Sequence, residues 1–143
     1  MSRSSGFTLV ELLVAIGVTA IAIGTLSPVA GTLRNHYRLA GAARELAFDI
    51  GRARLQAIGQ NQAIRFVTAS GGYQRQQSTD GVTYHASGGD TRLPAGVVLT
   101  AGESGMPRFD RQGLAQATTV LTLSGAAGQR TVTTNVLGRA SVQ

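Results

Sequence analysis

Residues 7–33, FTLVELLVAIGVTAIAIGTLSPVAGTL, form an apolar run of 27 residues at the start of a 143-residue chain. Glu11 is the only ionisable side chain in this run. As an α-helix the run would be roughly 40 Å long, which exceeds the ~30 Å hydrocarbon core of a bilayer. The run therefore predicts a transmembrane helix over residues 7–33.

Two other interpretations of this run are a cleaved secretory signal and an ordinary single-pass anchor. A cleaved secretory signal would use Arg3 as its charged region and end at small residues near Ala20 or Ala30. The length of the run opposes that interpretation, and so does Glu11, because a carboxylate at the bilayer centre costs about 2.5 to 3.5 kcal/mol. An ordinary single-pass anchor stays open, but it gives no reason for a charge so near the start of the run.

The segment GFTLVELL, residues 6–13, places Phe directly after Gly and a carboxylate four residues after that Phe. It resembles the processing site of type IV prepilins and type II secretion pseudopilins. The resemblance implies that prepilin peptidase removes residues 1–6 by cutting after Gly6, that Phe7 becomes an N-methylated terminus, and that Glu11 serves assembly. In the first helical turn, a carboxylate is stabilised by the helix dipole and can pair with a neighbouring subunit's amine.

Small and helix-breaking residues interrupt the apolar run at Gly17, Gly24 and Pro28. Proline removes a backbone donor and loosens the preceding turn. The resemblance implies that filament assembly stretches this segment, which gives Pro28 an assembly role. An ordinary transmembrane kink is the alternative, since Gly and Pro are common in such helices.

Apolar residues continue at helical spacing beyond residue 33, and they predict an amphipathic half of the helix over residues 34–60. The spacings alternate between four and three, at Leu39, Ala43, Leu46, Ile50, Ala53 and Ala57. A flanking polar stripe consists of Arg38, Glu45, Asp49 and Arg52. Asp49 and Arg52 are three residues apart and able to pair. Gly59-Gln60-Asn61 predicts the end of the helix.

Residues 61–143 read as short strands separated by glycine-rich turns, so they predict a β-rich globular domain. We expect an exposed hairpin from 63–69 and 73–77, a strand at 82–85 with Val82 and Tyr84 inward, a buried strand at 97–99, a hairpin from 119–123 and 130–136, and a last strand after Gly138. The expected core of the later hairpin is Leu121, Leu123, Val132 and Val136. The apolar seam of the helix supplies one wall of this thin domain.

Four segments of the second half resemble, in order, the globular domain of the GspH/FimT minor pseudopilins: LPAGV at 93–97, FDRQG at 109–113, GQRTV at 128–132, and Gly138-Arg139. The resemblance implies an α+β fold, with a long N-terminal helix packed on a small antiparallel two-sheet β domain. It also implies a minor pilin or pseudopilin at or near the tip of a type II secretion pseudopilus or a type IV pilus. Turn chemistry at the glycines and core packing by Phe109 are the plain alternative.

The charge balance raises the question of nucleic acid. All 13 basic residues are Arg, against 7 acidic residues, which gives a net charge of +6. Some members of this family bind DNA during transformation, and Arg130 and Arg139 stand near strand ends where phosphates could be reached. The DNA-binding members carry a second Arg where this chain has Ser141. We therefore favour a role for the arginines in solubility and subunit contacts over a role in DNA binding. If DNA is bound elsewhere than at Arg139, the further candidates are Arg75, Arg92, Arg108 and Arg111.

Nothing in the sequence favours catalysis, a cofactor or a metal. The chain has no Cys, and His36 and His85 have no ligand partners at metal-binding spacing. We expect a non-enzymatic, single-pass protein of the inner membrane with its C-terminal domain in the periplasm. Its expected partners are prepilin peptidase, the inner membrane and other pilins or pseudopilins. The choice between a secretion system and a pilus is left open.

Overall fold

A computed structural model describes residues 8–143, with the side chains of residues 24–29 excepted. Gly6 and Phe7 lie outside the described residues, and the side chain of Pro28 does too. The chain divides into two compact units, residues 1–34 and residues 35–143.

The first unit holds the N-terminal part of helix α1, which spans Leu9–Gln60. Thr8 caps the helix, because its Oγ1 atom accepts a hydrogen bond from the Glu11 N–H at 3.3 Å and its carbonyl accepts one from the Leu12 N–H at 3.1 Å. The described side chains of residues 9–23 are all exposed. Within the part of the chain that the structure describes, no helical stretch is both long and apolar enough to cross a bilayer.

In the second unit, the predicted apolar seam of α1 is confirmed. Its six members are between 0 and 3% exposed. The helix ends at Gln60, as the sequence indicates, and Asn61 takes a left-handed conformation with φ of 52°. The Gln62 N–H donates to the Ala57 carbonyl and the Asn61 N–H to the Ile58 carbonyl, which is the pairing of a Schellman cap.

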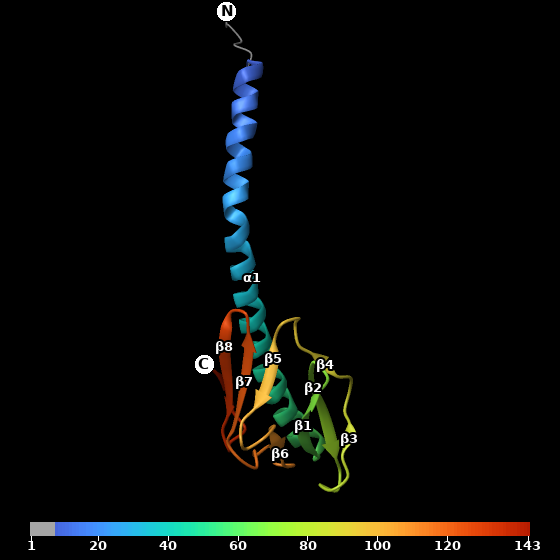
Figure 1. Ribbon diagram of the computed structural model, residues 1–143. Coiled ribbons are helices and arrows are strands. Elements are labelled where there is room, and N and C mark those ends of the chain that lie inside the picture. Colours follow the sequence, from blue (N-terminus) through green and yellow to red (C-terminus); the bar gives the residue numbers. More distant parts are fainter. Residues whose placement is uncertain (1–7) are drawn as a thin grey trace, which may run out of the picture. The chain divides into compact units, whose positions relative to one another are not determined.

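Two antiparallel sheets lie beside this half of α1 (Figure 1). The first has the order β3-β2-β1-β6, with β4 also paired to β2, and comprises β1 (Ala63–Ala69), β2 (Gly72–Ser78), β3 (His85–Ala86), β4 (Thr91–Arg92) and β6 (Arg108–Phe109). The second has the order β5-β7-β8-β9 and comprises β5 (Val98–Ala101), β7 (Thr119–Gly125), β8 (Gly128–Thr134) and β9 (Ala140–Val142). This arrangement is the expected α+β architecture with a two-sheet β domain.

One hydrophobic core joins the helix to both sheets. The first sheet contributes Ile64, Phe66, Tyr73 and Phe109, and the second contributes Leu121, Leu123 and Val132. The hairpin of β1 and β2 is therefore packed on the helix, and the expectation that it is exposed was wrong. Phe109 is a core residue, which confirms the alternative interpretation of the FDRQG segment as core packing by this side chain.

Three further expectations were wrong about burial. Val82 is 83% exposed, because a loop bound to the Asp80 carboxylate occupies residues 80–83 and the strand there is only His85–Ala86. Val136 is 52% exposed because β8 ends at Thr134. The strand expected at 97–99 runs from Val98 to Ala101 at a sheet edge, and its residues are exposed or half-buried.

Candidate functional site

Glu11 is the one residue of the predicted processing and assembly set whose side chain the structure describes. Its carboxylate is exposed in the first turn of α1. Thr8 and Glu11 have the Thr-x-x-Glu spacing of a capping box, a signal that our sequence reading missed. A role at the start of the helix would by itself account for an acidic residue at this position.

The apolar side chains on both sides of Glu11 in the sequence form an apolar surface on every side of α1. Between residues 9 and 23, nine large apolar side chains are 58 to 78% exposed: Leu9, Val10, Leu12, Leu13, Val14, Ile16, Val18, Ile21 and Ile23. Apolar surface in water is unfavourable by roughly 25 cal/mol per Å². This segment is therefore a surface that needs a covering of lipid or protein.

A second exposed apolar surface lies on the other half of α1. Tyr37, Phe48 and Leu55 are 71, 68 and 67% exposed. Their spacings of eleven and seven residues place them on one face of a helix, roughly opposite the buried seam. We call these three residues the outer stripe.

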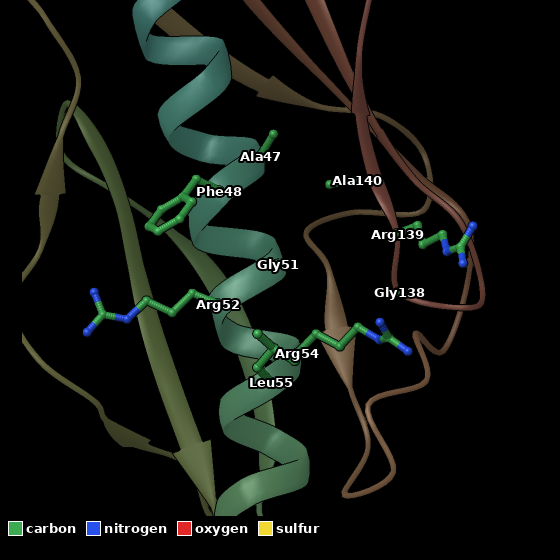
Figure 2. Close-up of a pocket in the computed structure, with 9 residues that line it drawn as sticks. All are labelled: Ala47, Phe48, Gly51, Arg52, Arg54, Leu55, Gly138, Arg139 and Ala140. Atoms are coloured by element: carbon green, nitrogen blue, oxygen red, sulfur yellow. The ribbon is translucent and has the colours of Figure 1, made fainter.

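A groove of about 670 Å³ adjoins the outer stripe. Phe48 and Leu55 line it from α1, Gly138 and Arg139 line it from the turn between β8 and β9, and Ala140 lines it from the start of β9 (Figure 2). The groove thus has an apolar floor and, in Arg139, a cationic residue of the predicted DNA set. Figure 2 shows Arg52 directed to the other side of the helix, away from Arg54 and Arg139.

Close contacts and backbone conformation near this groove explain why glycine stands at two positions, Gly113 and Gly138, of the segments that resemble the minor pseudopilins. Gly138 has a φ of +74°, and a Cβ there would lie 2.6 Å from Arg54 Cδ and 2.7 Å from the Gly113 carbonyl oxygen. The Arg54 Nε–H donates to that same carbonyl at 3.1 Å. A Cβ at Gly113 would lie 2.7 Å from Ile58 Cδ1. Gly138 is favoured by its positive φ and by the nearby Gly113 carbonyl, and Gly113 is favoured by its own φ of +75°. Sequence reasoning missed Arg54, which lies close to both glycines.

The predicted DNA-binding residues are not brought together. Arg130 pairs with Leu123 in the register of β7 and β8, whereas the Arg139 N–H donates to Asn135 Oδ1 at 2.9 Å. Five strand positions separate residues 130 and 135, which is roughly 17 Å along the sheet. Both arginines are exposed. The further candidates are spread over β2, β4, β6 and the loop after β6, at Arg75, Arg92, Arg108 and Arg111.

The polar stripe of α1 makes a specific contact with the first sheet. Asp49 Oδ2 accepts a hydrogen bond from the Tyr73 hydroxyl at 2.8 Å. Burial, together with the Asp49 carboxylate, holds the pKa of Tyr73 well above its ordinary value. Asp49 therefore ties β2 to the helix, a contact that its place in the polar stripe does not predict.

The structure offers no metal-binding cluster among the residues it describes. Within residues 8–143, no group of three or more His, Cys, Asp or Glu side chains is placed to hold an ion. His36 and His85 are exposed, on α1 and β3 respectively.

Comparison with known proteins gives two matches, each to less than half of the chain. Residues 1–27 match the family described as "Prokaryotic N-terminal methylation motif". The "Pilin-like protein PilA1" of Thermus thermophilus is 38% identical over 71 residues, which are 48% of this chain and 44% of that protein. The chain thus spans less than half the length of this curated relative. No solved structure matches the chain. With the helix and two-sheet domain described above, these findings support a type IV pilin-like protein.

Proposed function

We propose that the protein is a filament subunit made as a prepilin. In this proposal prepilin peptidase cuts after Gly6, Phe7 is methylated, and residues 7–33 hold the subunit in the inner membrane until it joins other pilins or pseudopilins. Residues 61–143 then lie in the periplasm. The match of residues 1–27 to the methylation motif supports the processing steps.

The exposed apolar surface of residues 9–23 carries the proposal. A globular protein buries most of its large aliphatic side chains, yet nine of them are more than half exposed within these fifteen residues. Lipid can cover them before assembly, and helices of other subunits can cover them afterwards. A filament subunit needs both states.

Glu11 and Pro28 have proposed roles in the transfer between those two states. The exposed carboxylate of Glu11 is costly in lipid and gains a partner when it meets the methylated amine of a neighbouring subunit. Pro28 loosens α1 so that the segment can adapt to the filament.

The finer proposal is a minor subunit at or near the tip of a type II secretion pseudopilus or a type IV pilus. It is supported by the order of the four segments between residues 93 and 139. Two of these segments contain Gly113 and Gly138, whose packing on Arg54 serves this domain architecture. The role is structural and requires no catalysis.

DNA binding during uptake is the second candidate. The net charge of +6 favours it. The separation of Arg130 and Arg139 along β8 counts against a single site built from both, so we keep the structural role as the first proposal.

The test follows Glu11→Ala in cells of the source organism, with Glu103→Ala as a control that removes an exposed carboxylate outside α1. We expect Glu11→Ala protein to be cut to a mature form beginning at methylated Phe7, as read by mass spectrometry, and to be missing from sheared filaments. The control should be cut and incorporated. Normal incorporation of Glu11→Ala, or a mature N-terminus near residue 31, would contradict the proposal.

A second pair of variants tests the outer stripe as a subunit contact. Phe48→Ser removes an exposed ring from α1, and Val98→Ser removes an exposed apolar side chain from the edge of the second sheet. Neither should alter the stability of the domain by more than about 0.5 kcal/mol. We expect Phe48→Ser to reduce incorporation more than Val98→Ser, and equal incorporation of the two would remove the outer stripe from the proposal.

A further inference from the structure

A small cavity of about 150 Å³ lies between α1, β2 and the loop that follows β3. Two arginines line it, Arg52 from α1 and Arg75 from β2. Arg75 shares with Tyr73 the face of β2 that is directed to α1, because residues two apart on a strand point the same way. Arg52 follows Asp49 by three residues and so lies on the same side of the helix.

The guanidinium of Arg75 is only partly satisfied. Its Nε atom is buried and, within the described part of the chain, has no hydrogen-bond partner. Its Nη2 atom reaches the Ser87 carbonyl at 3.5 Å, which is the upper limit of a hydrogen bond. A buried donor left unpaired is costly, and the cost is larger for a charged group. The cavity therefore presents an unused cationic donor.

The charges around the cavity favour an anion over a cation. Arg52 and Arg75 oppose one lining carboxylate, Asp49. The Tyr73 hydroxyl donates to that carboxylate and so already occupies part of its accepting capacity. Glu45, one turn earlier on α1, raises the pKa of Tyr73 through its charge but is not among the described residues that line the cavity.

Two glycines, Gly88 and Gly89, lie beside Arg75 in the lining of the cavity. Gly88 has a φ of +95°, and a Cβ added there would lie 3.9 Å from Arg75 Nη2. A side chain at this position would thus be strained and would stand against the guanidinium. Because residue 88 is glycine, only backbone atoms of the loop lie at this position beside the guanidinium.

We infer that this cavity is a binding site for a small oxyanion of the phosphate class. Its volume is below the roughly 300 to 1,000 Å³ of pockets that hold drug-sized ligands, so it suits a single charged group. A guanidinium recognises phosphate through directed, charge-assisted hydrogen bonds. The source is either free phosphate or a phosphodiester. The cavity shares Arg52 with the lining of the groove at Phe48 and Leu55, but the inference does not depend on the filament contacts proposed above.

The test is a titration of the full ¹⁵N-labelled chain in neutral detergent micelles. Inorganic phosphate and dimethyl phosphate are added separately at constant ionic strength, with chloride as the reference, and the Arg Nε–H resonances are followed. We expect a saturable shift of the Arg75 resonance. Saturation by inorganic phosphate alone assigns the site to free phosphate, and comparable saturation by dimethyl phosphate assigns it to phosphodiesters. A response to neither probe beyond that to chloride would overturn the inference.

Two variants that each remove one positive charge, one inside the cavity and one outside it, distinguish a built site from general attraction by the net charge of the protein. Arg75→Gln should weaken phosphate binding about tenfold or more, and Arg52→Gln several-fold, in line with the strength of charge-assisted hydrogen bonds. Asp49→Asn should tighten it, because a repelling charge is removed while an acceptor for Tyr73 remains. Arg92→Gln, which alters an exposed Arg outside the cavity, should leave binding within about twofold. Equal losses in Arg75→Gln and Arg92→Gln would reduce the effect to net charge and contradict the site.

Discussion

The two halves of α1 are both rich in apolar residues and have opposite surroundings. Between residues 9 and 23 the apolar side chains point in all directions and are exposed, whereas between residues 39 and 57 most of them follow one face and are buried, with Phe48 and Leu55 of the outer stripe exposed on the opposite face. Residues 9–23 contain one charged residue and residues 39–57 contain five, so composition and periodicity both distinguish the two halves. A helix that is apolar all round needs an apolar environment on every side, and an amphipathic one needs a single partner. Within the β domain's unit, that partner is the pair of sheets.

The largest expected effect separates the two halves directly. Leu46 is fully buried, and Leu46→Ala should destabilise the domain by about 2 to 5 kcal/mol through lost burial and a residual cavity. Leu13→Ala makes the same chemical change on the exposed segment and should leave that free energy of unfolding unchanged. Denaturant unfolding of the full chain in micelles, followed by the signals of the β domain, measures both. A comparable loss in Leu13→Ala would break the comparison.

The buried half was predictable because one local signal decides it. The spacing of Leu39 to Ala57 requires one buried face, and any β domain large enough to cover it would produce the observed pattern. The hairpins of β1 with β2 and β7 with β8 were predictable for a similar reason, since glycines mark their turns.

The errors concern properties that local pattern does not determine. Val82 and Val136 were assigned to the core from alternation alone, but strand length and loop bonding decided their exposure. The hydrogen bond from Arg54 to Gly113 joins residues that are 59 positions apart in the sequence. The cavity brings together Arg52 and Arg75, which are 23 positions apart. One sequence without a structure carries no signal for such pairs.

A smaller effect tests how tightly the domain is held to the second half of α1. Gly138→Ala places a Cβ against Arg54 and the Gly113 carbonyl at a positive φ, and should cost about 1 to 3 kcal/mol. Gly59→Ala adds the same methyl group in open space within α1 and should stabilise the domain by about 0.5 to 1 kcal/mol. Thermal unfolding of the two variants should move in opposite directions. Equal shifts would show that Arg54 yields and that this contact is loose.

The contact of Tyr73 with Asp49 gives this half of the helix a dependence on pH. The pKa of Tyr73 is raised in the folded state, so above its ordinary value of 10.0 the unfolded chain loses the phenolic proton while the folded chain retains it. Stability that is fully present below that pH is then lost as the pH rises. Tyr73→Phe should cost about 0.5 to 1.5 kcal/mol at neutral pH and should flatten the loss above pH 10. An unaltered alkaline profile in this variant would place the titrating group elsewhere.

The smallest expected effect concerns charge, which also divides the chain, since twelve of the thirteen arginines follow residue 33. Arg130 and Arg139 are exposed and roughly 17 Å apart along the sheet, so neither supports the other in a shared phosphate site. We expect weak duplex DNA binding that depends on salt, and we expect Arg130→Ala and Arg139→Ala each to reduce the log-log salt slope by about one or less. The measurement is the affinity of the full chain in micelles for one duplex at several salt concentrations. A much larger loss in Arg139→Ala than in Arg130→Ala would point to a built site beside the groove at Phe48 and Leu55, and it would raise DNA uptake above the structural role.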